Sequence, residues 1–122
     1  MTTGLRRAVF LDRDGVLNGA RIVDGKPFPP RGLEDLQIAS DAPKALESLR
    51  AAGFLLIGVT NQPDVARGVQ HRETVEAINA AVQAALPVLA IFTCYHDDQD
   101  RCDCRKPRPG LLIRAANQYS IH

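Results

Sequence analysis

Near its N-terminus the chain contains the stretch Ala8-Val9-Phe10-Leu11-Asp12-Arg13-Asp14-Gly15-Val16-Leu17-Asn18. Its apolar start predicts a short β-strand, and two aspartates follow where that strand ends. Side chains two residues apart leave a strand on the same side, so Asp12 and Asp14 are expected to converge. Such a pair can bind Mg²⁺, or can act as nucleophile and general acid/base. Taken alone, the pattern also fits a polar turn or a weak calcium-like loop.

The rest of the chain predicts an α/β fold. Apolar runs at residues 54–59 and 88–92 predict two further strands, and helical patterns separate the runs. Strands that alternate with helices favour a parallel sheet, and continuously apolar strands favour helices on both of its faces. We therefore expect residues 1–122 to form one domain with a three-layer, Rossmann-like sheet. The helices should face inward through Ala42, Ala45, Leu46 and Leu49, then Val75, Ile78, Ala81, Val82 and Ala85, then Leu111, Leu112 and Ala115.

Composition limits the classes of partner. Basic and acidic side chains nearly cancel, 15 against 14, so net charge gives no reason to expect nucleic acid or an anionic membrane surface as a partner. No apolar run approaches the roughly 20 residues that span a bilayer, and the first run is too short for a secretory signal. We expect a cytoplasmic protein with no membrane or nucleic-acid partner.

Polar residues follow each expected strand. The two aspartates follow the first strand, a hydroxyl and two amides follow the second, and two cations end the loop after the third. The residues of these last two sets are Thr60, Asn61, Gln62, Arg105 and Lys106. Because the carboxyl ends of parallel strands share one edge of the sheet, these groups should meet there. An acid/base pair, a hydroxyl and a cation together suit phosphoryl transfer.

A cluster of metal-binding residue types lies in the loop at about residues 94–107. Cys94, His96, Cys102 and Cys104 fall within eleven residues, and they include every cysteine of the chain. Four such ligands suit Zn²⁺ and leave no open position for water, which indicates a structural site. A bound zinc ion would order the loop and aim its final cations at the phosphate. Three reduced surface cysteines near an unrelated histidine are the alternative.

Four segments in order resemble the haloacid dehalogenase superfamily. Within it, they are most similar to subfamily IIIA, the small heptose-bisphosphate and histidinol-phosphate phosphatases. The segments are residues 11–18, 59–62, 66–68 and 102–107. The resemblance covers about residues 9–110 and implies a capless HAD-like domain that uses Mg²⁺, with a zinc loop as in many relatives.

The resemblance also implies a role for each matching residue. Asp12 matches the nucleophile that forms an aspartyl-phosphate, and Asp14 matches the general acid/base. Thr60 matches the hydroxyl that binds the phosphoryl group, and Lys106 matches the cation beside it. Mg²⁺ would be held by Asp12 and Asp14. The positions that match substrate-binding residues are Asn61, Gln62, Arg67 and Arg105. The substrate would be a small phosphorylated metabolite, either a sugar bisphosphate or histidinol phosphate.

One motif of the family has no counterpart. Relatives carry an acidic motif beyond the third helix that supplies a third carboxylate to Mg²⁺, whereas this sequence ends at His122. On this comparison the domain is C-terminally shortened, and an apolar sheet edge would be exposed. Three explanations stay open: part of a longer enzyme, a naturally short relative, or a partner that covers the edge, such as a second copy in a homo-oligomer. The alternative function is a weakly active or inactive zinc module that binds a phosphorylated ligand or a protein.

Overall fold

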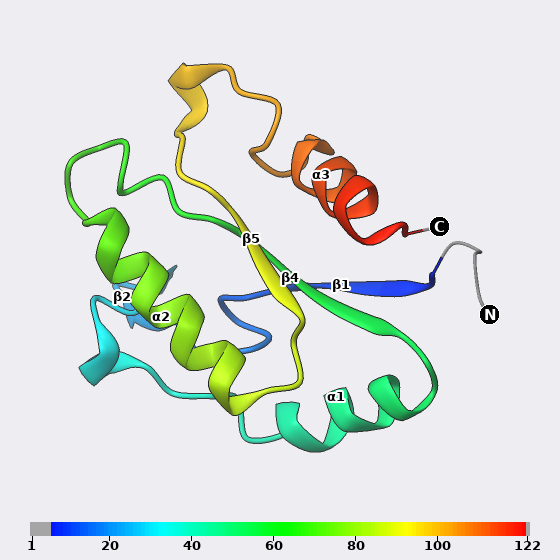
Figure 1. The fold of residues 1–122 in the computed structure, drawn as a ribbon. Coiled ribbons are helices and arrows are strands. Elements are labelled where there is room, and N and C mark those ends of the chain that lie inside the picture. Colours follow the sequence, from blue (N-terminus) through cyan, green and yellow to red (C-terminus); the bar gives the residue numbers. More distant parts are fainter. Residues whose placement is uncertain (1–5, 122) are drawn as a thin grey trace.

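The structure is a computed structural model that describes residues 6–121. Strands and helices alternate along the chain after an N-terminal hairpin (Figure 1). The elements are β1 (Ala8–Asp12), β2 (Arg21–Val23), β3 (Lys26–Phe28), η1 (Leu33–Asp35), α1 (Ala42–Ala51), β4 (Leu55–Asn61), α2 (Arg72–Ala85), β5 (Ala90–Cys94), η2 (Asp98–Asp100) and α3 (Gly110–Tyr119).

The central element is a parallel sheet with strand order β1-β4-β5. At its carboxyl edge Asp12 of β1 lies opposite Val59 of β4, and Asn61 of β4 lies opposite Cys94 of β5. The residues that follow the three strands therefore start from one edge. The predicted parallel sheet is confirmed.

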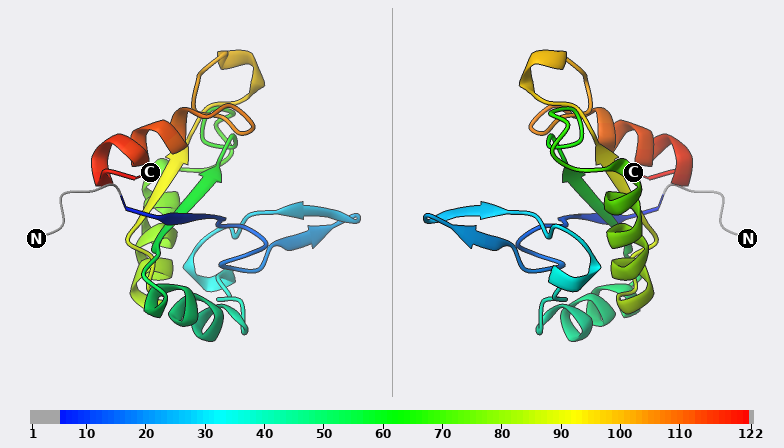
Figure 2. Two further views of the ribbon diagram at one scale, coloured as in Figure 1. Left: turned by 90° about the vertical axis from the view of Figure 1, so that its right-hand side faces the viewer. Right: turned by 90° about the vertical axis from the view of Figure 1, so that its left-hand side faces the viewer.

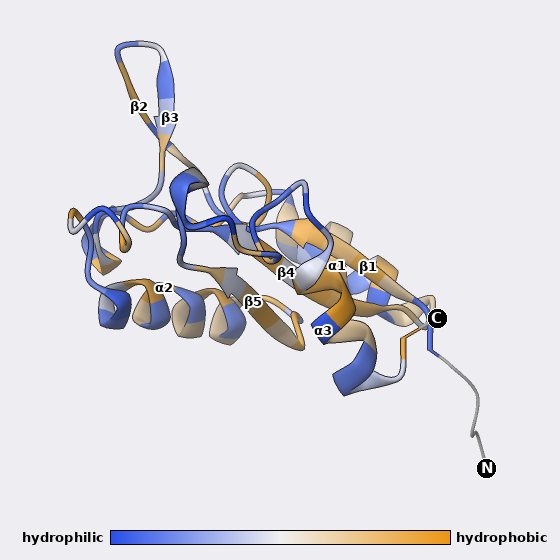
Figure 3. Ribbon diagram, turned by 90° about the horizontal axis from the view of Figure 1, so that it is seen from above, coloured by the Kyte–Doolittle hydropathy of each residue, from blue (hydrophilic) through white to orange (hydrophobic). Residues whose placement is uncertain are grey.

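Helices cover both faces of this sheet, as predicted (Figure 1). On one face Leu56 of β4 packs with Leu46 of α1 and Ile78 of α2. On the other face Ile57 of β4 packs with Ala115 of α3. Successive side chains of a strand point to opposite faces, so β4 contributes to both cores. In Figure 3 the sheet strands are largely coloured as hydrophobic, as expected for strands covered on both faces.

Three residues predicted to face the core are exposed instead: Ala45, Ala85 and Leu112. Ala45 and Leu112 each adjoin a buried leucine of the same helix, Leu46 or Leu111, and a step of one residue turns about 100° around a helix. Ala85 is the last residue of α2, and buried Leu86 follows it. A three-stranded sheet covers only a narrow stripe of each helix, so the flanking positions stay in contact with solvent.

The bounds of β4 and β5 also differ from the prediction. β5 runs from Ala90 to Cys94 rather than over residues 88–92, because Val88 is buried in the core where the chain turns toward the sheet. β4 extends through Asn61, so Thr60 lies within the strand rather than after it. The polar residues consequently begin inside the sheet.

The glycine- and proline-rich segment from residue 19 to 36 contains a small hairpin. β2 and β3 pair antiparallel across Asp24 and Gly25, which have φ angles of 51° and 76°. Positive φ at both central residues is typical of a tight hairpin turn. The hairpin projects from the body of the domain (Figure 2). Within the described part of the chain, each helix is too short or too polar to cross a membrane.

α3 begins in close contact with the Cys/His loop, and this contact predicts a stability effect. The Gly110 amide donates to the carbonyl oxygen of Asp103 at 2.9 Å, and a Cβ at position 110 would lie 2.3 Å from that oxygen. We expect Gly110→Ala to lower the free energy of unfolding by about 1–3 kcal/mol in urea denaturation. The added methyl group can be accommodated only if the backbone at Asp103 or at the start of α3 moves. Ile113→Ala, at an exposed position of the same helix, should change it by less than about 0.5 kcal/mol. Equal midpoints for wild type and Gly110→Ala would contradict this packing.

Candidate active site

A cation and a carboxylate meet at the carboxyl edge of the sheet. The ammonium of Lys106 donates to Asp12 Oδ1, and its Nζ lies 3.4 Å from the carbonyl oxygen of Val59. The Asp12 side chain is 56% exposed, so a ligand can reach it. Two residues that lie 94 positions apart in the sequence are thus brought into direct contact, as predicted.

Asp14 lies in a denser set of hydrogen bonds. Its Oδ1 accepts from Arg13 Nε at 3.1 Å, from Arg13 Nη2 at 3.0 Å and from Asn18 Nδ2 at 3.1 Å. Its Oδ2 accepts from Gln62 Nε2 at 2.8 Å. A carboxylate has about four lone-pair sites, two on each oxygen. Oδ1 is therefore saturated, and Oδ2 is the oxygen that retains capacity for a proton or a ligand.

Gln62 links Asp14 to Thr60. Its Nε2 also donates to Thr60 Oγ1 at 2.8 Å, and both side chains are 2% exposed. The Thr60 hydroxyl keeps its own hydrogen available for donation, because this bond uses the oxygen as acceptor. Gln62 was predicted to bind substrate, and its amide nitrogen is engaged in holding these two neighbours.

Asn61 fixes the backbone of Lys106. The Lys106 amide donates to Asn61 Oδ1 at 3.0 Å, and Asn61 Nδ2 donates to the Lys106 carbonyl oxygen at 3.3 Å. This reciprocal pair joins the end of β4 to the end of the Cys/His loop. Both polar ends of the Asn61 amide, predicted to face the substrate, are thus bonded to the chain itself.

The two arginines of the expected site line different cavities. Arg67 lies within 3.6 Å of Asp64 and 3.9 Å of Asp97, and it borders a cavity of about 500 Å³ beside Asp14. The hairpin forms the apolar wall of that cavity through Pro27, Phe28 and Pro29. Arg105 donates from Nη1 to the His96 carbonyl oxygen at 3.4 Å, and it borders a second cavity of about 250 Å³ with Lys106.

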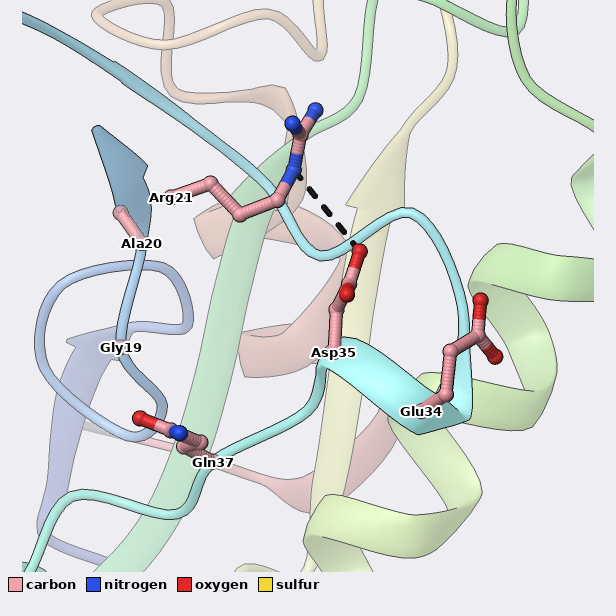
Figure 4. A pocket seen from close by; sticks show the side chains of 6 residues that line it. All are labelled: Gly19, Ala20, Arg21, Glu34, Asp35 and Gln37. Carbon is pink, nitrogen blue, oxygen red and sulfur yellow. Dashed lines mark ion pairs between the residues drawn. The ribbon is translucent and has the colours of Figure 1, made fainter. Parts of the chain in front are cut away.

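A third cavity, of about 290 Å³, lies where the hairpin joins the domain (Figure 4). Arg21 points toward Asp35 there, at 3.9 Å, and its Nε donates to the carbonyl oxygen of Pro29 at 3.0 Å. None of the predicted site residues lines this cavity. Its contacts anchor the base of the hairpin and so support the wall beside Asp14.

The Cys/His loop brings together all four predicted zinc ligands. Cys94 Sγ lies 3.5 Å from Cys102 Sγ, His96 Nδ1 lies 3.3 Å from Cys104 Sγ, and all four ligand atoms lie within 4.8 Å of one another. A tetrahedral ion with bonds of about 2.3 Å to sulfur needs sulfur–sulfur separations of about 3.8 Å. The donor set therefore fits zinc in both chemistry and spacing.

The thiols of this cluster differ in acidity. Burial raises the pKa of Cys94, and burial together with the other two thiols raises the pKa of Cys104 to about 12. Burial acts in the same direction on Cys102, but hydrogen bonds led by the Arg105 amide lower its pKa to about 6. One thiolate is thus favoured by the protein alone, and the other two thiols would have to lose their protons to serve as ligands of a bound cation.

The aspartate pair fits Mg²⁺ in a simpler way. Among the described side chains, the Cys/His set is the only group of three or more potential ligands close enough to hold one ion, so no third described carboxylate joins Asp12 and Asp14. Mg²⁺ is commonly bound through one or two carboxylates, with water and substrate phosphate completing its shell. Exposed Asp12 and the Oδ2 side of Asp14 offer such a pair.

Sequence reasoning missed two residues of this site, Arg13 and Asn79. Arg13 lies between the aspartates and is completely buried, and its Nη1 donates to Asn79 Oδ1 at 2.8 Å. Asn79 belongs to α2, on the buried stripe that includes Val75, Ile78 and Val82. A polar residue on an apolar helical stripe is a signal that could have identified it.

Comparison with known proteins identifies the family. No protein-family model matches the chain. A D-glycero-beta-D-manno-heptose-1,7-bisphosphate 7-phosphatase from Pasteurella multocida is 33% identical over 128 residues, which cover 96% of this chain and 66% of the relative. Among the similarly named relatives, the covered share of the relative runs from 65% to 78%. The chain thus spans about two thirds of the length of most curated relatives that it matches.

Solved structures agree with this assignment. The crystal structure of D,D-heptose 1.7-bisphosphate phosphatase from B. bronchiseptica, complexed with magnesium and phosphate, matches with a TM-score of 0.75 and 31% identity. The match covers 94% of this chain and 64% of that one. A putative HAD-like phosphatase from Mesorhizobium loti matches with a TM-score of 0.79 and 25% identity, over 97% of this chain and 59% of that one. The chain therefore belongs to the family of the D-glycero-D-manno-heptose-1,7-bisphosphate 7-phosphatases, within the haloacid dehalogenase superfamily.

Proposed function

We propose that the chain is the catalytic domain of an Mg²⁺-dependent phosphatase that hydrolyses a small phosphorylated sugar through an aspartyl-phosphate on Asp12. The observation that carries the proposal is the contact between Lys106 and exposed Asp12 at the carboxyl edge of the sheet. The names of the relatives favour a sugar bisphosphate over histidinol phosphate as the substrate.

In the first step a carboxylate oxygen of Asp12 attacks phosphorus and the bond to the leaving alkoxide breaks. Asp14 donates a proton to that alkoxide from Oδ2, since its Oδ1 is saturated by donors. In the second step water attacks phosphorus, Asp14 takes the proton from water, and inorganic phosphate leaves Asp12. Each proton that Asp14 gives in the first step is thus returned in the second.

Neighbouring groups position and stabilise the phosphoryl group. Lys106 offsets the negative charge that gathers between Asp12 and the phosphate. Thr60 donates its hydroxyl hydrogen to a phosphoryl oxygen, and Gln62 holds this hydroxyl beside Asp14. Bound Mg²⁺ would supply charge neutralisation of the phosphate from the side of Asp12 and Asp14.

The remaining site residues serve binding and order. We assign Arg67 and Arg105 to the rest of the substrate, because each borders a cavity next to the reacting groups. Asn61 holds the Lys106 backbone. Zinc on the four Cys/His ligands keeps the loop in the shape that this placement requires. The hairpin forms the apolar wall of the cavity beside Asp14, and we assign the selection of the substrate to this wall.

The test is phosphate release from a panel of phosphomonoesters with Mg²⁺, including a heptose 1,7-bisphosphate and histidinol phosphate. We expect release from the sugar bisphosphate to be fastest. Borohydride added during turnover reduces an acyl-phosphate, so Asp12 should be recovered as homoserine in the peptide that contains it. Ligand binding without phosphate release from any ester would overturn the proposal and favour a binding module.

A further inference from the structure

A chain of hydrogen bonds centred on buried Arg13 leads from β5 to Asp14. Thr93 of β5 accepts from Asn79 Nδ2 at 3.0 Å, and Asn79 Oδ1 accepts from Arg13 Nη1 at 2.8 Å. Arg13 in turn donates from Nε and Nη2 to Asp14 Oδ1. Segments far apart in sequence, β5, α2 and the turn after β1, are thereby connected through side chains alone.

The guanidinium of Arg13 cannot adopt this position without its partners. It is 0% exposed, and a buried charge is strongly unfavourable unless it is paired and hydrogen-bonded. Its donors form a planar fork, so an acceptor on one nitrogen fixes the direction of the others. Asn79 accepts from Nη1, the one guanidinium nitrogen that does not donate to Asp14, and therefore helps to fix the plane of the fork.

Asn79 is itself held at both ends of its amide. It is 8% exposed, donates to Thr93 and accepts from Arg13, so neither end is free to rotate. It lies on the stripe of α2 that also carries buried Val75 and Val82, and together with Thr93 it borders a cavity of about 400 Å³. A polar residue in this setting costs stability unless its bonds are made, which points to a role in orientation.

We infer that Asn79 is a positioning residue for Asp14, which it orients through the guanidinium of Arg13; this inference rests on the proposed phosphatase function. With Asn79 in place, Arg13 occupies Asp14 Oδ1 and turns Oδ2 toward Gln62 and the reacting groups. Displacement of a catalytic group by about 1 Å can reduce a rate about 10²-fold. Loss of Asn79 should therefore impair proton donation by Asp14 in particular.

Leaving-group dependence separates this role from a structural one. An alkyl phosphate needs a proton on its departing oxygen, whereas p-nitrophenyl phosphate releases a stable phenolate without one. For Asn79→Leu, which keeps similar volume, we expect kcat for a sugar phosphate to fall about 10- to 100-fold, with KM little changed. For p-nitrophenyl phosphate we expect a fall of less than about 3-fold. Asn79→Asp keeps an acceptor for Arg13 and should retain most of the sugar-phosphate rate.

Matched variants make the inference falsifiable. Val82→Ala opens a cavity on the same helical stripe and should lower both rates by one common factor, if at all. If Asn79→Leu does not fold, Thr93→Val removes the outer acceptor and should shift the ratio of the two rates in the same direction. An unchanged ratio in the variant that folds would overturn the inference. A wild-type protein inactive on both esters would overturn the phosphatase function, and the inference with it.

Discussion

Asp12→Asn is expected to reduce phosphate release from every substrate by at least about 10³-fold in kcat. The amide that replaces the carboxylate is not nucleophilic at neutral pH, so no aspartyl-phosphate can form. The substitution also removes the charge that faces the Lys106 ammonium. Steady-state rates with saturating Mg²⁺ measure the effect, and borohydride should no longer produce homoserine at position 12.

The same variant should fold as well as the wild type. Asp12 and Lys106 are both partly exposed, and pairs of this kind contribute about 0–1 kcal/mol to stability. A urea midpoint close to that of the wild type would assign the lost activity to chemistry. Glu47→Gln is a suitable control, because it neutralises an exposed carboxylate of α1 that bonds to Arg50 on the same helix. Equal rates in Asp12→Asn and wild type would refute Asp12 as nucleophile.

The sheet and the pairing of Asp12 with Lys106 could be predicted because they depend on chain topology. Apolar runs separated by helical patterns define a parallel sheet, and the residues after its strands must meet at one edge. The prediction that these residues meet holds even when the predicted end of a strand is wrong by two residues. The third strand was displaced by that amount, and Lys106 still reaches Asp12.

The role of Asn79 could not be predicted by the same rule. Whether a helical residue contacts Arg13 depends on the rotation of α2 over the sheet, which the apolar period defines only approximately. The same uncertainty led to the wrong inward placement of Ala45 and Leu112. The hydrogen bonds of Asn61 and Gln62 within the protein could not be predicted either. They depend on the directions of side chains, which the spacing of residues in the sequence does not determine.

Replacing one proposed zinc ligand is expected to cause a large loss of thermal stability and of bound zinc. Cys104 is 1% exposed and lies two residues before Lys106, so Cys104→Ala removes a ligand and weakens the support of the loop that carries the Lys106 ammonium to Asp12. Zinc at about 1,000 times its dissociation constant adds about 4 kcal/mol to stability. In a chain of this size that loss corresponds to a fall in Tm of about 12–20 °C. Metal analysis by mass spectrometry should find one zinc per chain in wild type and much less in the variant.

A control from the same loop separates metal binding from loop sequence. Asp103 lies between two of the proposed ligands, and its exposed carboxylate pairs with Arg114 rather than with the cluster. Asp103→Asn should therefore retain zinc and a Tm within about 2 °C of the wild type, since exposed pairs contribute little.

Activity and zinc content should decline together, because the loop reaches the site through Lys106. Asn61 would still hold the Lys106 backbone through two hydrogen bonds, so a metal-depleted protein is expected to retain some phosphate release. Chelation at a temperature below the lowered Tm should accordingly reduce kcat in proportion to the zinc removed, and added zinc should restore it. A wild-type protein that contains no zinc and keeps its Tm in a chelator would show that the four side chains are close for another reason, and that the loop is ordered by its contacts with α3 and β4 alone.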